Sequence, residues 1–264
     1  MTSALDLRQH IPPVAKVPAK PSLGFVGSGQ TAPKDFEAEQ YRVLSYVVEQ
    51  LGRAGRTVIA ITSPVAGDGK TITSINLART LAQAPGSRIL LVDADLRRGS
   101  VGDQLGVGRS TSRGLAGAIA DRGCGLDAVV RCLPALNLSV LTAGVCPPMP
   151  YEALRSPRAG ELLREARERY DYVLVDTPPV VPVADARAIS QWVDGFFLVV
   201  AAHYTPRALL DDALSAMDPE KVVGLVYNGD DLPLSRQYRS YYGYGESAPK
   251  PSFWASLVGD GRRR

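Results

Sequence analysis

Six short apolar runs alternate with segments of helical periodicity, and this alternation constrains the fold more than any other feature of the sequence. The runs are TVIAIT (57–62), RILLVD (88–93), LSVLTA (138–143), DYVLVD (171–176), GFFLVVAA (195–202) and KVVGLVY (221–227). The helical segments lie near residues 70–84, 112–121, 157–169, 184–192 and 205–217. Continuous apolar strands that alternate with helices are typical of parallel sheets covered on both faces. We therefore predict an α/β fold: a doubly wound, mostly parallel sheet flanked by helices, with its site at the carboxyl ends of the strands.

Composition divides the chain into three parts. Residues 1–34 are rich in Pro, Ala, Lys, Gly and Ser, which cannot build a core, so we expect a flexible leader there. Residues 35–228 hold the periodic segments, preceded by a helix that we expect from Asp35 to about Gly52. In residues 229–264 the alternation of apolar runs and helical segments stops, and we expect a flexible tail rich in tyrosine and basic residues.

Several classes of protein are excluded by what the sequence lacks. No apolar run approaches the roughly 20 residues of a membrane-spanning helix, and the N-terminus has no apolar core typical of a secretory signal. We therefore expect a cytoplasmic protein with no transmembrane segment of its own. The three cysteines lack C-x-x-C spacing and the two histidines lie far apart, which argues against a zinc site. The part of the chain before the basic tail is nearly neutral, so we expect no nucleic-acid partner.

A glycine-rich loop stands between the first apolar run and the helix that follows it. The loop and the first helical residues read SPVAGDGKT (63–71), where glycines allow backbone N–H groups to turn towards phosphate oxygens. Pro64 stands where the usual phosphate-binding pattern has its first glycine. The context of strand, glycine loop and helix nevertheless predicts binding of ATP or GTP. The candidate cofactor-binding residues are Gly67, Asp68, Gly69, Lys70, Thr71 and Ile72.

Aspartates end two other apolar runs. Asp93 and Asp95 follow the second run, and Asp176 ends the run DYVLVD. Asp93 and Asp95 are two residues apart, so both face one side if the chain stays extended. Carboxylates beside a triphosphate require a divalent cation between them. We therefore expect a Mg²⁺ site, with Thr71, Asp93 and Asp176 as ligands; the alternative is that the first two aspartates cap the following turn.

In combination these motifs resemble the bacterial tyrosine kinases of capsule and exopolysaccharide biosynthesis, a branch of the Min- and Par-type P-loop ATPases. The resemblance rests on SPVAGDGKT (63–71), DADLR (93–97) and YDYVLVDTPPV (170–180), supported by PPMPYEALRSPRAGELL (147–163), and it covers about residues 35–245. It implies ATP and Mg²⁺ as cofactors. Catalytic roles are implied for Lys70, Asp93, Asp95 and Asp176, and nucleotide contacts for Arg97 and Asn228.

A tyrosine cluster in the tail extends the resemblance. Tyr238, Tyr241, Tyr242 and Tyr244 lie within seven residues, among Gly, Ser and Arg. In the family such a tail is phosphorylated in a neighbouring subunit, which implies a protein-tyrosine autokinase that regulates exopolysaccharide or capsule synthesis or export. A tyrosine hydroxyl has a pKa of about 10, so a carboxylate or a metal ion would have to assist its deprotonation, and either Asp93 or Asp95 could serve. The alternative is a tail that only binds a partner.

The family also implies partners. These are the cytoplasmic tail of a membrane activator, which would recruit the protein to the inner face of the plasma membrane, and further copies of the chain for autophosphorylation in trans. The family's oligomerisation motif E-x-x-R-x-x-R reads Glu39, Arg42 and Ser45 here, so a closed ring does not follow from the sequence. The alternative function is a Min- or Par-like switch ATPase that regulates a membrane partner without tyrosine kinase activity.

Overall fold

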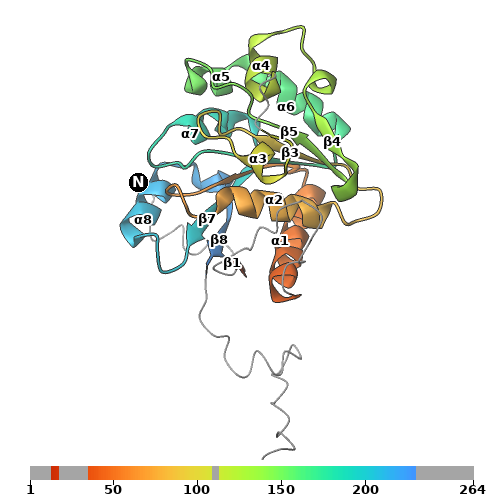
Figure 1. Ribbon diagram of the computed structural model, residues 1–264. Coiled ribbons are helices and arrows are strands. Elements are labelled where there is room, and N and C mark those ends of the chain that lie inside the picture. Colours follow the sequence, from red (N-terminus) through yellow and green to blue (C-terminus); the bar gives the residue numbers. More distant parts are fainter. Residues whose placement is uncertain (1–12, 18–34, 109–112, 230–264) are drawn as a thin grey trace, which may run out of the picture. The chain divides into compact units, whose positions relative to one another are not determined.

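A sheet of eight strands forms the centre of the computed structural model, which describes residues 13–17, 35–108 and 113–229 (Figure 1). Its strands are β1 (Pro13–Val17), β2 (Val58–Thr62), β3 (Ile89–Asp93), β4 (Arg131–Leu133), β5 (Leu138–Leu141), β6 (Tyr172–Asp176), β7 (Gly195–Ala201) and β8 (Val222–Asn228). Their order is β1-β8-β7-β2-β6-β3-β5-β4, and every neighbouring pair is parallel except β4 and β5. The predicted α/β fold with a mostly parallel sheet is therefore confirmed, and each of the six predicted runs forms a strand.

The helices occupy the segments that the periodicity predicted, with two short additions. They are α1 (Asp35–Arg53), α2 (Lys70–Leu81), α3 (Val101–Gln104), α4 (Gly114–Ala120), α5 (Pro150–Arg155), α6 (Pro157–Arg169), α7 (Asp185–Ile189) and α8 (Arg207–Ser215). The sequence did not predict α3 and α5, which are only four and six residues long. Within the described residues, no helix is both long enough and apolar enough to span a bilayer.

Alternate side chains of the central strands build two separate cores. Ile59 and Ile61 of β2 pack with α1 and α2, whereas Val58 and Ala60 pack with helices on the opposite face, among them α6. Residues of α4, α5 and α6 belong to one core and those of α1 and α2 to the other, and Figure 1 shows α4, α5 and α6 grouped at the top of the view, apart from α1 and α2. Because both faces are covered, the edge formed by the carboxyl ends of the strands is where polar side chains can gather.

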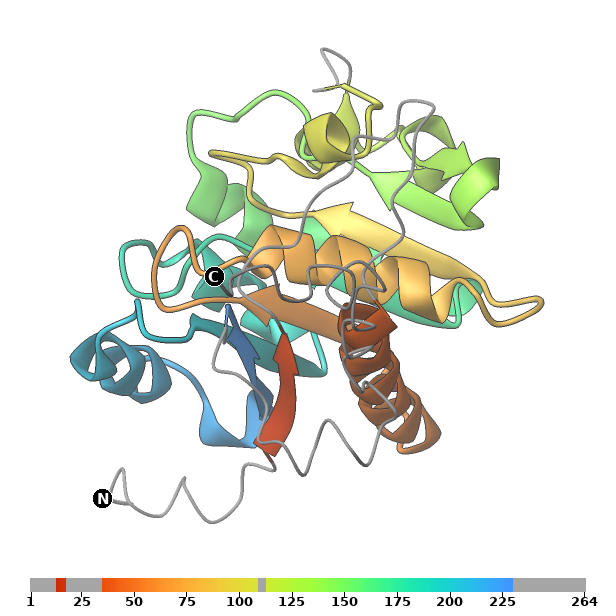
Figure 2. The ribbon, with the colours of Figure 1, turned by 60° about the horizontal axis from the view of Figure 1, so that its bottom comes forward.

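One part of the predicted leader is a strand. Pro13–Val17 forms β1, which pairs in parallel with β8 at the edge of the sheet (Figure 2). The prediction of a flexible leader over residues 1–34 is therefore wrong for these five residues. The physical reason is that β8 would otherwise present unpaired backbone groups, and a short strand satisfies them. Pro13 is the first residue of β1, where the missing N–H of proline is tolerated.

The start of β2 is held in place by a carboxylate from a distant part of the chain. Asp194, just before β7, accepts hydrogen bonds through Oδ2 from the backbone N–H groups of Thr57 (2.9 Å) and Val58 (2.8 Å). Arg167 of α6 donates to the other carboxylate oxygen at 2.7 Å. These contacts fix the amino end of the strand whose carboxyl end leads into the glycine loop.

Replacement of Asp194 by alanine should destabilise the protein, since two partly buried N–H groups would lose their acceptor. We expect the free energy of unfolding to fall by about 2 kcal/mol, measured by urea denaturation. Asp121→Ala is the matched control, because that carboxylate forms an exposed pair with Arg113 and exposed pairs contribute at most about 1 kcal/mol. Equal effects of the two substitutions would contradict the anchoring role of Asp194.

Candidate nucleotide-binding site

The loop between β2 and α2 adopts a conformation that requires glycine at two positions. Gly67 has φ 97° and Gly69 has φ 93°, both in the left-handed region that other residues rarely adopt. At Gly69 there is also no room for a side chain, because a Cβ atom would lie 1.9 Å from Nδ2 of Asn228. The loop leads directly into α2, which begins at Lys70, so backbone N–H groups at this helix start are available to an anion.

Asn228, the last residue of β8, is packed against this loop. Its Nδ2 donates to the backbone oxygen of Asp68 at 2.9 Å. Its Oδ1 is buried and has no hydrogen-bond partner among the residues that the structure describes. A buried acceptor without a donor is costly, and a donor on a bound base would satisfy it. Asn228 therefore fits the nucleotide contact that the family resemblance implies.

The side chain of Asp68 does not lie where a cofactor-binding side chain is expected. Its carboxylate is fully buried and accepts hydrogen bonds from the Thr205 hydroxyl (2.6 Å) and the backbone N–H of Val65 (3.2 Å). The side chain does not line the cavity described below. Through its carboxylate it holds the shape of the loop.

A cavity of about 540 Å³ opens in front of the loop and the start of α2. Its lining residues are Ala66, Gly67, Gly69, Lys70, Thr71, Ile72, Asp95, Arg97, Arg98, Gln104, Pro178, Pro179, Pro182 and Val183. Seven of the predicted site residues are among them. The side chains of three further predicted residues, Asp93, Asp176 and Asn228, lie behind or beside this lining.

Asp176 is, like Asp68, a fully buried acidic residue of the site. It accepts hydrogen bonds from the hydroxyl of Thr71 at 2.7 Å and from that of Ser74 at 3.0 Å. Burial raises the pKa of Asp176, and the charge of Lys70 together with the two hydroxyls opposes this effect. Ser74 was not among the site residues predicted from the sequence, although its position one helical turn after Thr71 was a signal. Thr71 and Asp176 together supply the hydroxyl and carboxylate oxygens that suit Mg²⁺.

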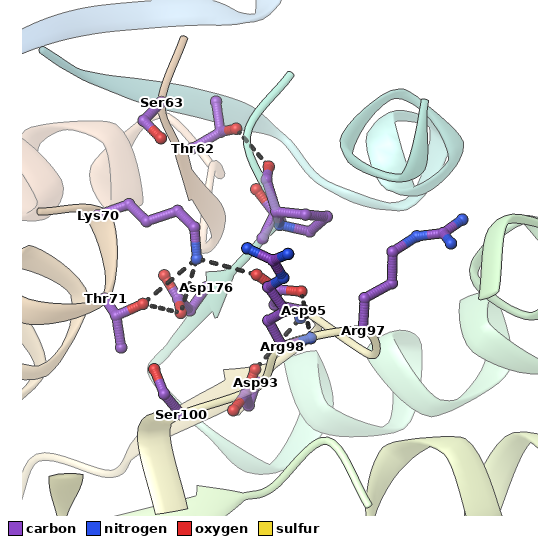
Figure 3. A network of polar contacts seen from close by, with 12 residues as sticks. Thr62, Ser63, Lys70, Thr71, Asp93, Asp95, Arg97, Arg98, Ser100 and Asp176 are labelled. Atoms are coloured by element: carbon purple, nitrogen blue, oxygen red, sulfur yellow. Dashed lines mark hydrogen bonds and ion pairs between the residues drawn. The ribbon is translucent and has the colours of Figure 1, made fainter. Parts of the chain in front are cut away.

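The ammonium group of Lys70 lies between two carboxylates. Its Nζ is 3.2 Å from Asp95 Oδ2 and 3.6 Å from Asp176 Oδ2, as Figure 3 shows. Burial alone would lower the pKa of Lys70, but the surrounding carboxylates, Asp176 above all, outweigh burial and raise it. Lys70 is therefore charged and positioned at the mouth of the loop, as a phosphate-binding lysine must be.

Asp93 has neighbours that differ from those of Asp95. Its Oδ1 accepts from the backbone N–H of Asp95 (3.2 Å) and its Oδ2 from that of Val101 (3.1 Å). It lines a second cavity of about 290 Å³ between the ends of β3 and β5. Burial, followed by the charge of Asp176, raises the pKa of Asp93 to about 8.

The three aspartates have different immediate partners. The Lys70 ammonium lies between Asp95 and Asp176, while the backbone of the turn after β3 binds Asp93. Among the described residues, no group of three or more His, Cys, Asp or Glu side chains is placed to hold a metal ion. The expected Mg²⁺ ligands, Thr71, Asp93 and Asp176, include only two acidic side chains, so this ligand set stays a prediction.

Arg97 forms an ion pair with a residue that the sequence did not predict as its partner. Its Nε and Nη2 donate to the two carboxylate oxygens of Asp185 at 2.6 and 3.1 Å, and Asp185 is almost completely buried. The Asp185 pair raises the pKa of Arg97. No local pattern pointed to Asp185 or to Thr205, because their partners lie 88 and 137 residues away. The four tail tyrosines, Tyr238, Tyr241, Tyr242 and Tyr244, lie outside the described residues.

The raised pKa of Asp93 predicts a dependence of stability on pH in the protein free of nucleotide and magnesium. A carboxyl group whose pKa rises from 3.8 in the unfolded chain to about 8 in the folded protein stabilises the fold at low pH. This contribution should be lost as the pH rises from about 4 to about 8. We expect the unfolding free energy of Asp93→Asn, measured by urea denaturation in EDTA, to increase relative to that of the wild type as the pH rises across this window. Parallel curves for the two proteins would contradict the raised pKa.

Comparison with known proteins identifies the family. Residues 59–145 match the family described as CobQ/CobB/MinD/ParA nucleotide binding domain. The chain is 35% identical over 217 residues to the tyrosine-protein kinase YwqD of Bacillus subtilis (strain 168), covering 81% of this chain and 89% of that relative. It is 32% identical over 218 residues to the succinoglycan biosynthesis transport protein ExoP of Rhizobium meliloti (strain 1021), covering 80% of this chain but only 27% of ExoP. The kinase domain of the Escherichia coli tyrosine kinase ETK has a similar structure, with a TM-score of 0.74 and 26% identity over 87% of this chain and 94% of that one.

The match to the Bacillus protein covers more than four fifths of each chain and extends well beyond the nucleotide-binding loop. The arrangement of that loop, Lys70 and Asp176 at one edge of the sheet agrees with it. The chain belongs to the bacterial tyrosine-protein kinases, within the MinD and ParA group of nucleotide-binding domains.

Proposed function

We propose that the protein transfers the γ-phosphoryl group of Mg-ATP to tyrosine side chains, its own C-terminal tyrosines among them. The observation that carries this proposal is the charged Lys70 beside Thr71 and Asp176, at the mouth of a glycine loop, in a chain of the tyrosine kinase family. In phosphoryl transfer the protein mainly positions the reactants and stabilises charge. Each element of this arrangement serves one of those two tasks.

Each residue of the site has a separate role in phosphoryl transfer. The backbone of the glycine loop and Lys70 bind the phosphates, and Thr71 and Asp176 hold Mg²⁺, which neutralises charge on the phosphate oxygens when bound. The tyrosine oxygen forms a bond to the γ-phosphorus while the bond from that phosphorus to the β–γ bridging oxygen breaks, which releases ADP. The tyrosine proton passes to a carboxylate. Asp95, which lines the nucleotide cavity, and Asp93, which lines the adjacent one, are the candidate acceptors.

The biological setting is proposed from the relatives. The name of ExoP in Rhizobium meliloti refers to succinoglycan biosynthesis and transport, and this supports a role in exopolysaccharide or capsule synthesis or export. We propose that a membrane activator binds this chain through a cytoplasmic tail and recruits it to the inner face of the plasma membrane. Copies of the chain would then phosphorylate each other in trans at Tyr238, Tyr241, Tyr242 and Tyr244.

Incubation of purified protein with Mg-ATP should produce phosphotyrosine between residues 238 and 244, detected by mass spectrometry of tryptic peptides. Lys70→Ala should abolish the modification, because the substitution removes the positive charge at the phosphates. Arg88→Ala is the matched control, since it removes an exposed cation far along the sheet from the loop, paired with Asp171. The control should retain phosphorylation close to that of the wild type.

The same experiment separates the kinase from a switch ATPase. Release of ADP that depends on Lys70, without any phosphotyrosine even when a membrane activator is added, would contradict the kinase and favour a Min- or Par-like switch. To test transfer in trans, Lys70→Ala protein is mixed with a second variant that keeps Lys70 but has phenylalanine in place of the four tail tyrosines. Phosphotyrosine on the Lys70→Ala chain is the expected result, and its absence would contradict transfer between copies.

A further inference from the structure

Three basic side chains line the nucleotide cavity, and two of them are already neutralised. Lys70 pairs with Asp95 and Asp176. Arg97, the arginine of the segment DADLR (93–97), is bound by both oxygens of Asp185. The third is Arg98, which is exposed to the cavity and forms no ion pair with any residue that the structure describes.

The backbone at Arg98 is fixed by its neighbours. Its N–H donates to Asp95 Oδ1 at 3.0 Å. The next residue, Gly99, is packed so closely that a Cβ atom would lie 2.6 Å from Ala143 Cβ and 2.8 Å from Asp93 Oδ2. Figure 3 shows the Arg98 side chain extending into the space beside the Lys70 ammonium, whereas Arg97 extends away from it. A cation that starts from a fixed backbone loses less entropy when it binds a ligand.

The order of strands indicates which phosphate Arg98 can reach. The loop after β2 binds phosphates, and in the sheet β2 has β7 and β8 on one side and β6 and β3 on the other. Asn228 ends β8, so a base that contacts Asn228 lies on that side of the loop. Arg98 follows β3 and lies on the opposite side, beyond Asp176 at the end of β6. A nucleotide whose base is near Asn228 therefore places its terminal phosphate towards Arg98.

We propose that Arg98, and not Arg97, is the arginine that binds the γ-phosphate of ATP and stabilises the charge of the phosphoryl group during transfer. The proposal rests on the kinase function proposed above. Mg-ATP is still anionic, and the carboxylates beside Lys70 offset that lysine's charge, so the site needs a further cation at its far end. The guanidinium of Arg98 pairs with no carboxylate in the part of the chain that the structure describes, whereas Arg97 uses two of its donors on Asp185.

The test compares the binding of two nucleotides and does not depend on turnover. Isothermal titration calorimetry with Mg²⁺ measures the dissociation constants of ADP and of the β,γ-imido analogue of ATP. Arg98→Gln should weaken the imido analogue about tenfold or more, the value of a charge-assisted hydrogen bond, and ADP by less than about twofold. Arg98→Lys should recover part of the loss, because it keeps the charge without the fork of donors. The matched control, Arg122→Gln, removes an exposed arginine outside the cavity and should change neither constant.

Each other outcome overturns the inference. Equal weakening of ADP and the analogue by Arg98→Gln would show that Arg98 does not select the γ-phosphate, and unchanged binding would show that it contacts no phosphate. Selective loss of the analogue in Arg97→Gln but not in Arg98→Gln would assign the role to Arg97. If the wild type binds neither nucleotide, the proposed kinase function fails together with this inference; if the wild type binds both and only the Arg98 result fails, the kinase function stands.

Discussion

The positive charge of Lys70 is the constraint on which the rest of the site depends. Asp176 is fully buried, and among the described residues its charge is compensated by this ammonium and by the hydroxyls of Thr71 and Ser74. Removal of one partner from such a group leaves the other charge buried and unpaired, which is far more costly than the absence of both. The helix start at Lys70, the end of β6 and the turn after β3 are therefore held together by one electrostatic arrangement, and a triphosphate with its metal would have to replace the same contacts.

Arginines at adjacent positions have different tasks in this arrangement. Arg97 ties the turn after β3 to the start of α7 through a bidentate pair with Asp185, which is a structural contact. Arg98 remains without a carboxylate partner among the described residues and faces the cavity. A sequence motif that contains an arginine therefore identifies the segment, but the partners of each side chain decide which arginine is available to a ligand.

The features that the sequence predicted are those with a local cause. Continuous apolar runs predict buried strands, and the glycine loop with Lys70 and Thr71 predicts a phosphate site, because the relevant residues are neighbours in the chain. The contacts of Arg97 with Asp185 and of Asp68 with Thr205 join distant segments, and nothing in the local sequence distinguishes these residues. The leader was misjudged at Pro13–Val17 for a related reason, since composition does not show the free edge of β8 to which this segment pairs. The metal role expected of Asp93 stays a prediction, and the structure adds that both of its oxygens accept hydrogen bonds from backbone N–H groups of the turn that follows.

Asn228 belongs both to the last strand and to the nucleotide loop, and this determines where the C-terminal segment departs from the sheet. Its side chain contacts Asp68 and closes the space above Gly69, and residue 229 follows directly. The segment with the tyrosines is therefore attached at the nucleotide-binding loop. Tyr244 lies sixteen residues further along the chain, a path that spans up to roughly 50 Å when fully extended. If the tail tyrosines are the phosphoryl acceptors proposed above, this length is an upper limit on the distance between Asn228 of one copy and the active site in which its Tyr244 reacts.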